Sequence, residues 1–494
     1  MFKKIVIANR GEIAVRIVRA CRDLGIATVA LYTDLDQGSL HVRLADECWP
    51  LSTPQGYNDA AQILQVAQQS GADAIHPGYG FLAERADFAE ACAAAGITLI
   101  GPPAAVLSTL QNKVLTLQTA QKAGFSVPPY SPQCVAEDDQ TTVAEQAKAL
   151  GYPIIIKSCR GGRGRGQRIV YTADELAAKV AQAQNEARQV YGSDELYLEH
   201  AIMPVHYISV QILADAQGHI IHLGEREGSL LFNNQKVIEE SPAPCLNPTE
   251  RAALWQQALD LARLFKYQGA GGVEFLVDSQ GRSYFMEIKA RIQVEHAVSE
   301  MVSGVDIVRE QIRIAAGEPL CQSQADIQLR GCAIECRINA EDPWRRYLPS
   351  PGQLHRFRLP AGPAVRVDTY GDKGSQIPVL YDSLLANLAV WAETRGECTV
   401  RLRRALEDFK IGGIQTNLPL HLQVVQNAAF LAGEYDTSSM RQISLTETST
   451  ADQLRRDLAV AAAVAFTVRN QTGTAVLPER VLSGWHRSSR HLQG

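Results

Sequence analysis

The sequence lacks the features that mark membrane, nucleic-acid-binding and secreted proteins. No apolar run approaches the ~20 residues that a membrane-spanning helix needs. The formal net charge of −5 over 494 residues leaves no basic excess for nucleic acid or an anionic membrane surface. The chain begins MFKKIVI and runs directly into an expected strand, so no signal peptide is predicted. These absences favour a soluble cytoplasmic protein.

Two further patterns are missing. The ten cysteines are scattered, with only Cys332 and Cys336 close together, so they show neither zinc-type spacing nor the density of a disulfide scaffold. We expect them to be reduced and mostly packed. The turn ANRGE (8–12) lacks the second and third glycines of a dinucleotide fingerprint, although its backbone N–H groups could receive an anion.

The length and the apolar fraction of 46% predict two to four domains with ample core. The first of them should lie within residues 1–113. Here short apolar stretches alternate with helical spacing, as in the expected strands 4–8 and 27–32 around a helix over 13–24. Such βαβ alternation predicts a doubly wound parallel sheet.

The segment YFMEIKARIQVEH (284–296) has a period of two, with charged and polar side chains on one side and apolar ones on the other. This pattern predicts an extended segment with a charged front. A solvated edge strand is the alternative. A second stretch, GGVEFLV (271–277), places Glu274 among strand-forming residues. Two carboxylates on neighbouring strands, Glu274 and Glu287, would form a cradle suited to Mg²⁺ and a phosphorylated oxyanion.

A glycine-rich stretch, SCRGGRGRGQR (158–168), follows an expected strand that ends in Lys157. Its amides could donate to a triphosphate, and LYLEH (196–200) supplies a matching strand. Arg160 and Arg163 interrupt the glycines. They either clamp phosphate or are solvated, and the sequence leaves both readings open.

From residue 5 to about 417 the chain resembles biotin carboxylase, an ATP-grasp enzyme. The motifs that carry the resemblance are IANRGEIA (7–14), HPGYGFL (76–82), Glu274, Glu287, RIQVEH (291–296) and ECRINAEDP (335–343). The resemblance implies a multidomain α/β and α+β fold. Its expected parts are an N-terminal α/β domain (1–113), an ATP-grasp domain (114–329) with a mobile lid near 131–203, a biotin carboxylase C-terminal domain (330–445), and a helical, linker-like tail (446–494).

The resemblance also implies a reaction. ATP phosphorylates bicarbonate to carboxyphosphate, which delivers CO₂ to N1 of biotin, with Mg²⁺ on the nucleotide. The chain contains no AMKM biotin-attachment motif, so the biotin should arrive on a separate carrier protein. The implied partners are this biotin carboxyl carrier protein and the carboxyltransferase subunit of an acyl-CoA carboxylase. The chain should form a homodimer, or a heterodimer with a paralogue.

Roles follow at the matched positions. ATP binding is expected from Lys113, Lys157, Gly161, Gly162, Gly164, Gly166, Glu199, Ile202, Glu274 and Glu287. Glu274 and Glu287 are also the expected metal ligands. Bicarbonate is expected to bind Arg291, Gln293, Val294 and Lys236. The expected catalytic residues are Glu295 as general base, Arg337 as stabiliser of the biotin enolate, Arg291 and Lys236.

Several positions depart from the family pattern. Lys289 stands where the family has Asn, and an ammonium cannot ligate a metal, so one Mg²⁺ rather than two is left open. Leu231, Asn234 and Asn387 replace a Gln, a His and a Lys. Two alternatives follow: an impaired paralogue with a regulatory or structural role in a carboxylase complex, and a divergent ATP-grasp carboxylate ligase.

One histidine lies next to a matched position rather than on it. The nucleotide-contacting His of the family corresponds to Tyr207, whereas His206 is one residue earlier. A shift of one residue on a strand turns a side chain to the opposite face. His206 is therefore expected to be an ordinary strand residue.

Overall fold

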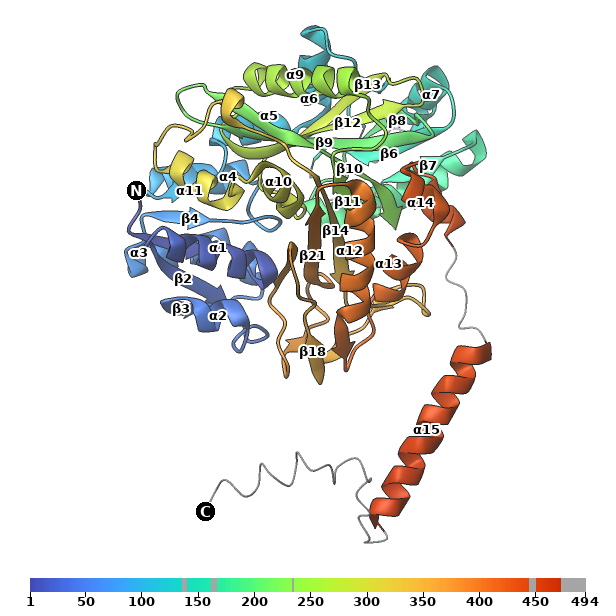
Figure 1. Ribbon diagram of the computed structural model, residues 1–494. Helices are drawn as coiled ribbons and strands as arrows, with labels where there is room; N and C mark the ends of the chain where they lie inside the picture. The colour runs from blue at the N-terminus through green and yellow to red at the C-terminus, as the bar shows by residue number, and fades with distance from the viewer. Residues whose placement is uncertain (136–139, 161–166, 233–234, 444–449, 472–494) are drawn as a thin grey trace. The chain divides into compact units, whose positions relative to one another are not determined.

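The computed structural model describes residues 1–135, 140–160, 167–232, 235–443 and 450–471 (Figure 1). The chain divides into two compact units, Met1–Ile443 and Ser444–Gly494. The first unit combines a parallel sheet flanked by helices with a large antiparallel sheet. This arrangement confirms the predicted mixed α/β and α+β class.

The N-terminal part is built on a five-stranded parallel sheet of order β3-β2-β1-β4-β5, which confirms the predicted doubly wound sheet. Its strands are β1 (Lys4–Ile7), β2 (Ala27–Tyr32), β3 (Glu47–Pro50), β4 (Ala74–His76) and β5 (Thr98–Leu99). The helices are α1 (Gly11–Asp23), α2 (Leu40–Leu44), α3 (Ala60–Ser70), α4 (Ala86–Ala94) and α5 (Ala104–Gln111). Helix α1 buries Ile13, Ile17 and Ala20 because helical spacing places these residues on one face.

A central eight-stranded antiparallel sheet follows, in the order β13-β12-β9-β10-β11-β14-β21-β19. Its strands are β9 (Val205–Ala214), β10 (Ile220–Phe232), β11 (Gln235–Ser241), β12 (Gly269–Asp278), β13 (Ser283–Lys289), β14 (Cys332–Asn339), β19 (Val365–Thr369) and β21 (Leu384–Ala392). The flanking helices are α6 (Lys113–Lys122), α9 (Pro248–Leu264), α10 (His296–Ser303) and α11 (Ile307–Ala315). Helix α9 begins with a capping box between Asn247 and Glu250.

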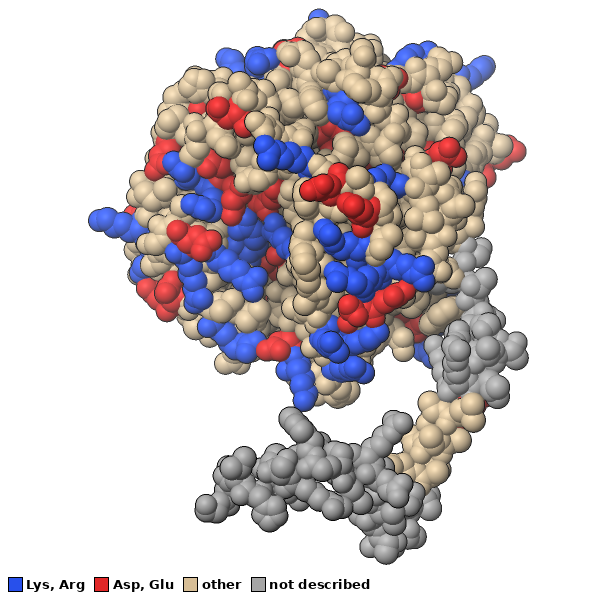
Figure 2. All heavy atoms as spheres, viewed as in Figure 1, with Lys and Arg blue, Asp and Glu red and all other residues tan. Residues whose placement is uncertain are grey.

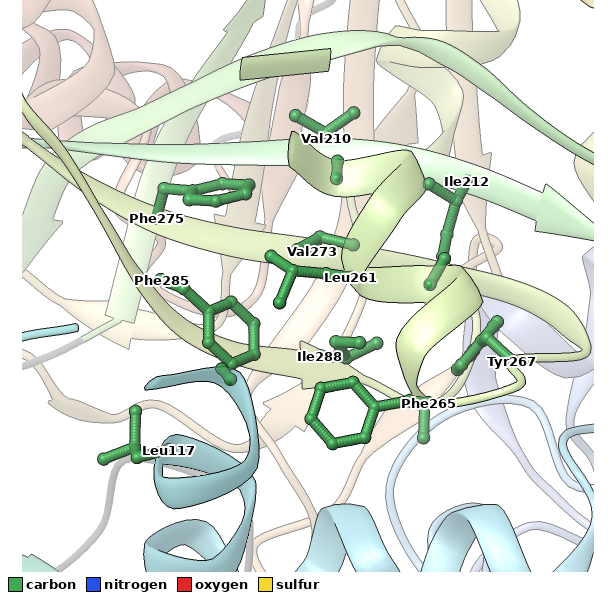
Figure 3. Packing of buried hydrophobic residues seen from close by; sticks show 14 of the residues in the cluster. Leu117, Val210, Ile212, Leu261, Phe265, Tyr267, Val273, Phe275, Phe285 and Ile288 are labelled. Carbon is green, nitrogen blue, oxygen red and sulfur yellow. The ribbon is translucent and has the colours of Figure 1, made fainter. Parts of the chain in front are cut away.

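The main core lies between this sheet and its helices (Figure 3). Val273 and Phe275 of β12 pack with Phe285 and Ile288 of β13 and with Leu261 of α9. Alternate residues of β12 therefore fill the core, whereas β13 buries Phe285 and Ile288 on either side of a register shift. Because Glu274 lies between the core residues Val273 and Phe275 and pairs directly with Glu287, both carboxylates lie on the face opposite this core.

A smaller three-stranded antiparallel sheet of order β7-β6-β8 occupies the region predicted as the lid. Its elements are β6 (Ile154–Ser158), β7 (Arg168–Val170), β8 (Leu196–His200), α7 (Gln140–Leu150) and α8 (Leu176–Tyr191). It has its own hydrophobic cluster, which includes Val143, Ile154, Val180 and Leu196.

The C-terminal part of the first unit contributes β14, β21 and β19 to the central sheet and adds short strand pairs. These are β15 (Glu341–Asp342) with β16 (Leu348–Pro349), β17 (Gly352–Gln353) with β20 (Gln376–Ile377), and β18 (Arg356–Arg358) with β22 (Lys410–Gly412). Helices α12 (Arg395–Asp408), α13 (Leu418–Val424) and α14 (Ala428–Ala432) complete it.

The second unit contains helix α15 (Thr450–Gln471), in the region predicted to be a helical tail. Large apolar side chains of this helix, among them Leu458 and Phe466, are exposed. Across the part of the chain that the structure describes, no helix is both long enough and apolar enough to span a membrane.

Two predictions require correction. The cysteines are not all reduced, because Cys134 and Cys159 form a disulfide between segments 25 residues apart in sequence. Most of the free cysteines are packed as predicted, since five of the eight are buried, whereas Cys48 and Cys321 are exposed. The extended segment predicted over 284–296 ends as a strand at Lys289. Beyond it the chain turns, and α10 starts at His296, so residues 290–295 approach the site from a loop.

Candidate active site

Glu274 and Glu287 face each other directly across β12 and β13. Glu274 is buried, and the Glu287 side chain is 16% exposed. Two carboxylates on opposed residues of paired strands lie within reach of one shared cation. The strand alternation read from the sequence therefore brings these two residues together.

Lys289 already supplies a cation at this position. Its Nζ lies 2.7 Å from Glu287 Oε1 and 3.9 Å from Glu274 Oε2. Burial alone would lower the pKa of Lys289, but the two carboxylates raise it above its usual value, so the side chain is an ammonium. The charge of Lys289 thus bridges the two expected metal ligands.

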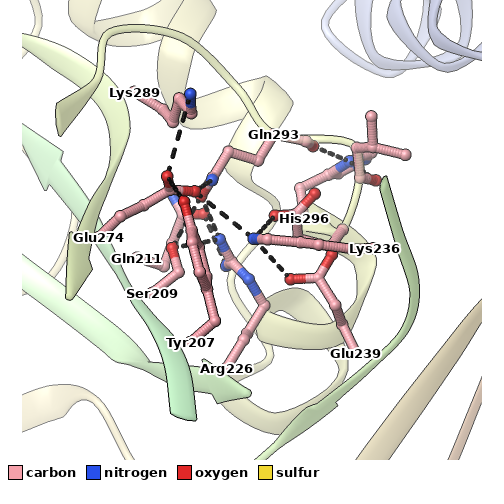
Figure 4. A network of polar contacts seen from close by, with 12 residues as sticks. Tyr207, Ser209, Gln211, Arg226, Lys236, Glu239, Glu274, Lys289, Gln293 and His296 are labelled. Carbon is pink, nitrogen blue, oxygen red and sulfur yellow. Dashed lines mark hydrogen bonds and ion pairs between the residues drawn. The ribbon is translucent and has the colours of Figure 1, made fainter. Parts of the chain in front are cut away.

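The Glu274 carboxylate is surrounded by further donors (Figure 4). The Tyr207 hydroxyl donates to Oε2 at 2.5 Å, Gln293 Nε2 donates to Oε1 at 2.9 Å, and Lys236 Nζ lies 3.5 Å from Oε1. With Lys289 these donors contact both oxygens. A divalent ion bound by Glu274 would have to displace part of this set.

A second charged cluster adjoins the first. Lys236 Nζ lies 3.0 Å from Glu239 Oε1 and 2.9 Å from Glu295 Oε1. Arg337 Nη2 lies 3.0 Å from Glu239 Oε2 and 2.8 Å from Glu295 Oε2. Two cations and two carboxylates therefore alternate in a closed ring of ion pairs, and Lys236 connects this ring to Glu274.

The two carboxylates of this ring differ in their proton affinity. Burial would raise the pKa of Glu295, but Lys236 and Arg337 hold it well below its usual range, so Glu295 is ionised. Burial raises the pKa of Glu239 to about 7, and the Glu295 carboxylate adds to the rise. Glu295 is thus the carboxylate that is available to accept a proton from a group bound beside it.

The sequence interpretation missed Arg226, which positions Gln293 in this site. Arg226 of β10 is fully buried and donates to Gln211 Oε1 at 2.9 Å, to Ser299 Oγ at 2.6 Å, and to Gln293 Oε1 (Figure 4). It therefore holds the amide of Gln293 in the orientation that donates to Glu274. The run GEREGS (224–229) inside a strand was the signal, because charged residues in a buried strand need partners.

The expected nucleotide-binding residues lie around this centre. Lys113 Nζ is 3.4 Å from Glu287 Oε2, and the buried Lys157 forms an ion pair with Glu199, which also accepts from Tyr197 at 2.7 Å. Ile202 follows β8 and is half-buried. Gly161, Gly162, Gly164 and Gly166 lie outside the described residues.

The expected bicarbonate-binding residues are not all in one cluster. Gln293 and Lys236 share Glu274, whereas Arg291 Nε lies 3.2 Å from Glu84 Oε2 and Arg291 Nη1 donates to the Ile292 carbonyl. The Val294 carbonyl lies 3.1 Å from His296 Nδ1. Arg291 thus contacts the N-terminal part rather than the ring of ion pairs.

The departures from the family pattern fall on both sides of the ring. Leu231 pairs with Lys236 across β10 and β11, and the buried Asn387 pairs with Arg337 across β14 and β21. Arg160 forms an exposed ion pair with Glu195 at 3.3 Å. Asn234 and Arg163 lie outside the described residues.

Glu274 and Glu287 can supply oxygen ligands to one divalent cation that is also bound by an anionic substrate. It also offers lysines for phosphate, an ionised carboxylate as base, and an arginine beside that base. Lys289 does not fit a second divalent cation between the same two carboxylates, because its charge already lies there.

Comparison with known proteins assigns most of the chain. Residues 1–107 match the biotin carboxylase N-terminal domain, residues 112–323 the ATP-binding domain of the carbamoyl-phosphate synthase L chain, and residues 335–442 the biotin carboxylase C-terminal domain. Biotin carboxylase 1 of Bacillus subtilis is 44% identical over 441 residues, which are 88% of this chain and 98% of that protein. A pyruvate carboxylase subunit of Methanothermobacter thermautotrophicus is 44% identical over 440 residues, 88% of this chain and 89% of that protein.

Solved structures agree. The biotin carboxylase domain dimer of Hydrogenobacter thermophilus 2-oxoglutarate carboxylase, in complex with MgADP, ADP and bicarbonate, has a TM-score of 0.88 and 41% identity, and the match covers 90% of this chain and all of that one. Biotin carboxylase from Campylobacter jejuni has a TM-score of 0.86 and 39% identity, covering 90% of this chain and 99% of that one. The chain belongs to the biotin carboxylase family of ATP-grasp enzymes.

Proposed function

We propose that this chain catalyses the ATP-dependent carboxylation of biotin by bicarbonate. The observation that carries the proposal is the ring of Lys236, Glu239, Glu295 and Arg337 next to the Glu274–Glu287 pair. Phosphoryl transfer needs positioning and charge neutralisation, which the Glu pair and its lysines provide. Carboxyl transfer needs a base and a group that stabilises the biotin enolate, which Glu295 and Arg337 provide.

In the first step an oxygen of bicarbonate attacks the γ-phosphorus of ATP, the bond to ADP breaks, and carboxyphosphate forms. Glu295 accepts the bicarbonate proton. Lys236 orients the anion, and Lys113 and Lys157 are the phosphate-binding lysines. Bound Mg²⁺ would neutralise part of the triphosphate charge.

In the second step carboxyphosphate releases CO₂ and phosphate, and the phosphate takes the proton from biotin N1. A bond then forms between N1 and CO₂. Arg337 stabilises the negative charge on the ureido oxygen, with its ion pairs to Glu239 and Glu295 fixing the guanidinium in place.

The biotin is delivered by a separate carrier protein, and the product goes to a carboxyltransferase. Relatives that are named as subunits of pyruvate carboxylase and of 2-oxoglutarate carboxylase support an assembly of this kind. The chain acts in the cytoplasm as a dimer. By the same resemblance, Arg19 and Asp23, which are exposed on α1, lie on the helix that matches the family's dimer interface and are the expected contact residues.

ADP release by the purified chain tests the proposal. Release should require both bicarbonate and biotin, and Lys236→Met should abolish it. The matched control is Lys122→Met at the exposed end of α6, which should keep full activity. ADP release at the same rate with and without biotin would contradict the proposal.

A second candidate is a paralogue that binds nucleotide without turnover, and the bridge made by Lys289 favours it. In that case calorimetry would detect ADP binding, but no addition of biotin or carrier protein would produce ADP release.

A further inference from the structure

A cluster of soft and hard donor atoms lies on the face of the central sheet opposite the nucleotide site. His206 is on β9, Glu227 is on β10, and Cys245 is in the turn that connects β11 to α9. His206 contacts Glu227, whereas the adjacent Tyr207 contacts Glu274, so the two side chains leave β9 on opposite faces. The imidazole nitrogen, carboxylate oxygen and thiol sulfur all lie within 4.8 Å of one another.

Glu227 is the anionic centre of this cluster. The carboxylate is fully buried, and His206 Nδ1 (2.6 Å) and Ser229 Oγ (2.8 Å) both contact its Oε1. Within the described part of the chain, Oε2 is buried and accepts no hydrogen bond of normal geometry, and the Cys245 thiol is close enough to interact with this carboxylate. An unpaired oxygen of a buried carboxylate is costly, so a cation at this oxygen would be strongly stabilised.

Neighbouring carboxylates add negative charge around the cluster of His206, Glu227 and Cys245. Burial would lower the pKa of His206, but Glu227, and more weakly Asp436, raise it and favour the protonated ring, and Glu225 lies near Cys245. Glu225 is already held by Arg251 at 2.7 Å and by the Trp255 indole at 2.7 Å. The protein therefore supplies an arginine to Glu225, while Glu227 is left with a histidine as its cationic partner.

We propose that His206, Glu227 and Cys245 form a Zn²⁺ site that is separate from the Mg²⁺–nucleotide site. Imidazole nitrogen, thiolate sulfur and carboxylate oxygen are the three donor types that zinc takes in proteins. Mg²⁺ prefers oxygen ligands and would not use the thiolate. On binding, the Cys245 S–H bond and one N–H bond of the protonated His206 ring break, both protons pass to solvent, and Zn–S and Zn–N bonds form.

Three protein ligands leave a fourth tetrahedral position for water or another donor. The bound ion would connect β9, β10 and the turn before α9. These elements adjoin the segment that leads from β8 of the lid into β9, so the ion would stabilise the part of the sheet from which the lid extends. This role does not depend on biotin carboxylation.

Cobalt substitution tests the site in the full-length chain. Protein stripped of metal with a chelator is titrated with Co²⁺, and thiolate ligation is detected by its sulfur-to-cobalt charge-transfer band in the near ultraviolet. We expect the band to appear at one equivalent and Zn²⁺ to displace it, while excess Mg²⁺ leaves it unchanged. Co²⁺ at the carboxylates of the nucleotide site would give no thiolate band, so failure here is distinct from failure of the proposed activity.

Cys245→Ser should lose the band, whereas the matched variants Cys48→Ser and Cys321→Ser, at exposed cysteines, should keep it. Absence of the band in the wild-type chain, or its persistence in Cys245→Ser, overturns the proposal. Alkylation of the wild-type chain gives a readout that needs no folded variant. Zn²⁺ should protect Cys245 from alkylation and leave Cys48 and Cys321 reactive, and equal reactivity with and without Zn²⁺ would refute the site.

Discussion

Replacing Lys289 by Asn should convert a site that binds one divalent cation with nucleotide into a site that binds two. In the wild-type chain the ammonium lies 2.7 Å from Glu287 Oε1 and 3.9 Å from Glu274 Oε2. It therefore acts as a fixed cation between two carboxylates. An Asn side chain would remove the charge and provide an oxygen ligand next to Glu287.

The magnitude follows from the distances. A divalent ion about 4 Å from the ammonium would be repelled by roughly 8 kcal/mol at an effective dielectric constant of about 20, before relaxation. Relief of about 1.4 kcal/mol of this repulsion tightens cation binding about tenfold. The variant should therefore gain an ion that the wild-type chain excludes.

The same change should destabilise the metal-free protein. Lys289 keeps 11% side-chain exposure, and removing one partner from a largely buried ion pair costs about 3 kcal/mol. We use the lower end of the usual range because Lys113 and Lys236 still offset part of the negative charge. Mg²⁺ should restore most of the lost stability in the variant and should raise the stability of the wild-type chain only slightly.

Counting Mn²⁺ by electron paramagnetic resonance in the presence of ADP measures the ion number, and urea unfolding with and without Mg²⁺ measures the stability. Lys289→Met is the matched control, because it removes the charge without adding a ligand, and it should show the destabilisation without the full gain in ion binding. Two Mn²⁺ ions per site in the wild-type chain would show that Lys289 does not replace a metal.

Four further outcomes are expected. Glu295→Gln should abolish biotin-dependent ADP release while leaving ADP binding within about twofold by calorimetry, since a carboxamide cannot accept the bicarbonate proton; appreciable turnover would remove Glu295 from its role. Burial raises the pKa of Glu239 to about 7, so between the ordinary pKa of a Glu side chain and pH 7 the folded chain holds a proton that the unfolded chain has lost. The free energy of unfolding should therefore fall as pH rises through about 7. Glu239→Gln should flatten that fall in urea titrations, and an unchanged slope would contradict the assignment. Reduction of the Cys134–Cys159 disulfide, which closes a loop of 25 residues, should lower stability by up to about 3 kcal/mol, and Cys134→Ser should make the chain insensitive to reductant. Light scattering should give a dimer at micromolar concentration, and a clean monomer would refute the predicted contact.

The fold was largely readable from hydrophobic periodicity. Short apolar strands separated by helical spacing predicted the parallel sheet, and the alternation around Glu274 and Glu287 predicted that both carboxylates leave their strands on one face. The loss of strand structure after Lys289 was not readable, because the period of two continues to His296 in the sequence. The turn there depends on where β13 loses its partner β12, which is a tertiary property.

The site was predicted as a set of residue types more accurately than as a set of contacts. Sequence alone could not show that Lys289 reaches both carboxylates, because that depends on the register of β12 and β13. It also gave no reason to pair Arg291 with Glu84, which lie in segments far apart in the chain. Arg226 was overlooked because its function is to orient Gln293 rather than to contact a substrate.

The surface also agrees with the absence of a basic excess. On the face drawn in Figure 2, Lys and Arg side chains are interspersed with Asp and Glu. A mixed surface of this kind gives no broad field of one sign to attract nucleic acid.

The most direct test of the central claim is the transfer of labelled carbon from bicarbonate to biotin. The purified chain is incubated with ATP, Mg²⁺, free biotin and labelled bicarbonate, and carboxybiotin is quantified under alkaline conditions that preserve it. The proposed function predicts label in carboxybiotin that depends on ATP and disappears in Glu295→Gln. Bound nucleotide without any labelled carboxybiotin, from free biotin or from biotinylated carrier protein, would contradict it.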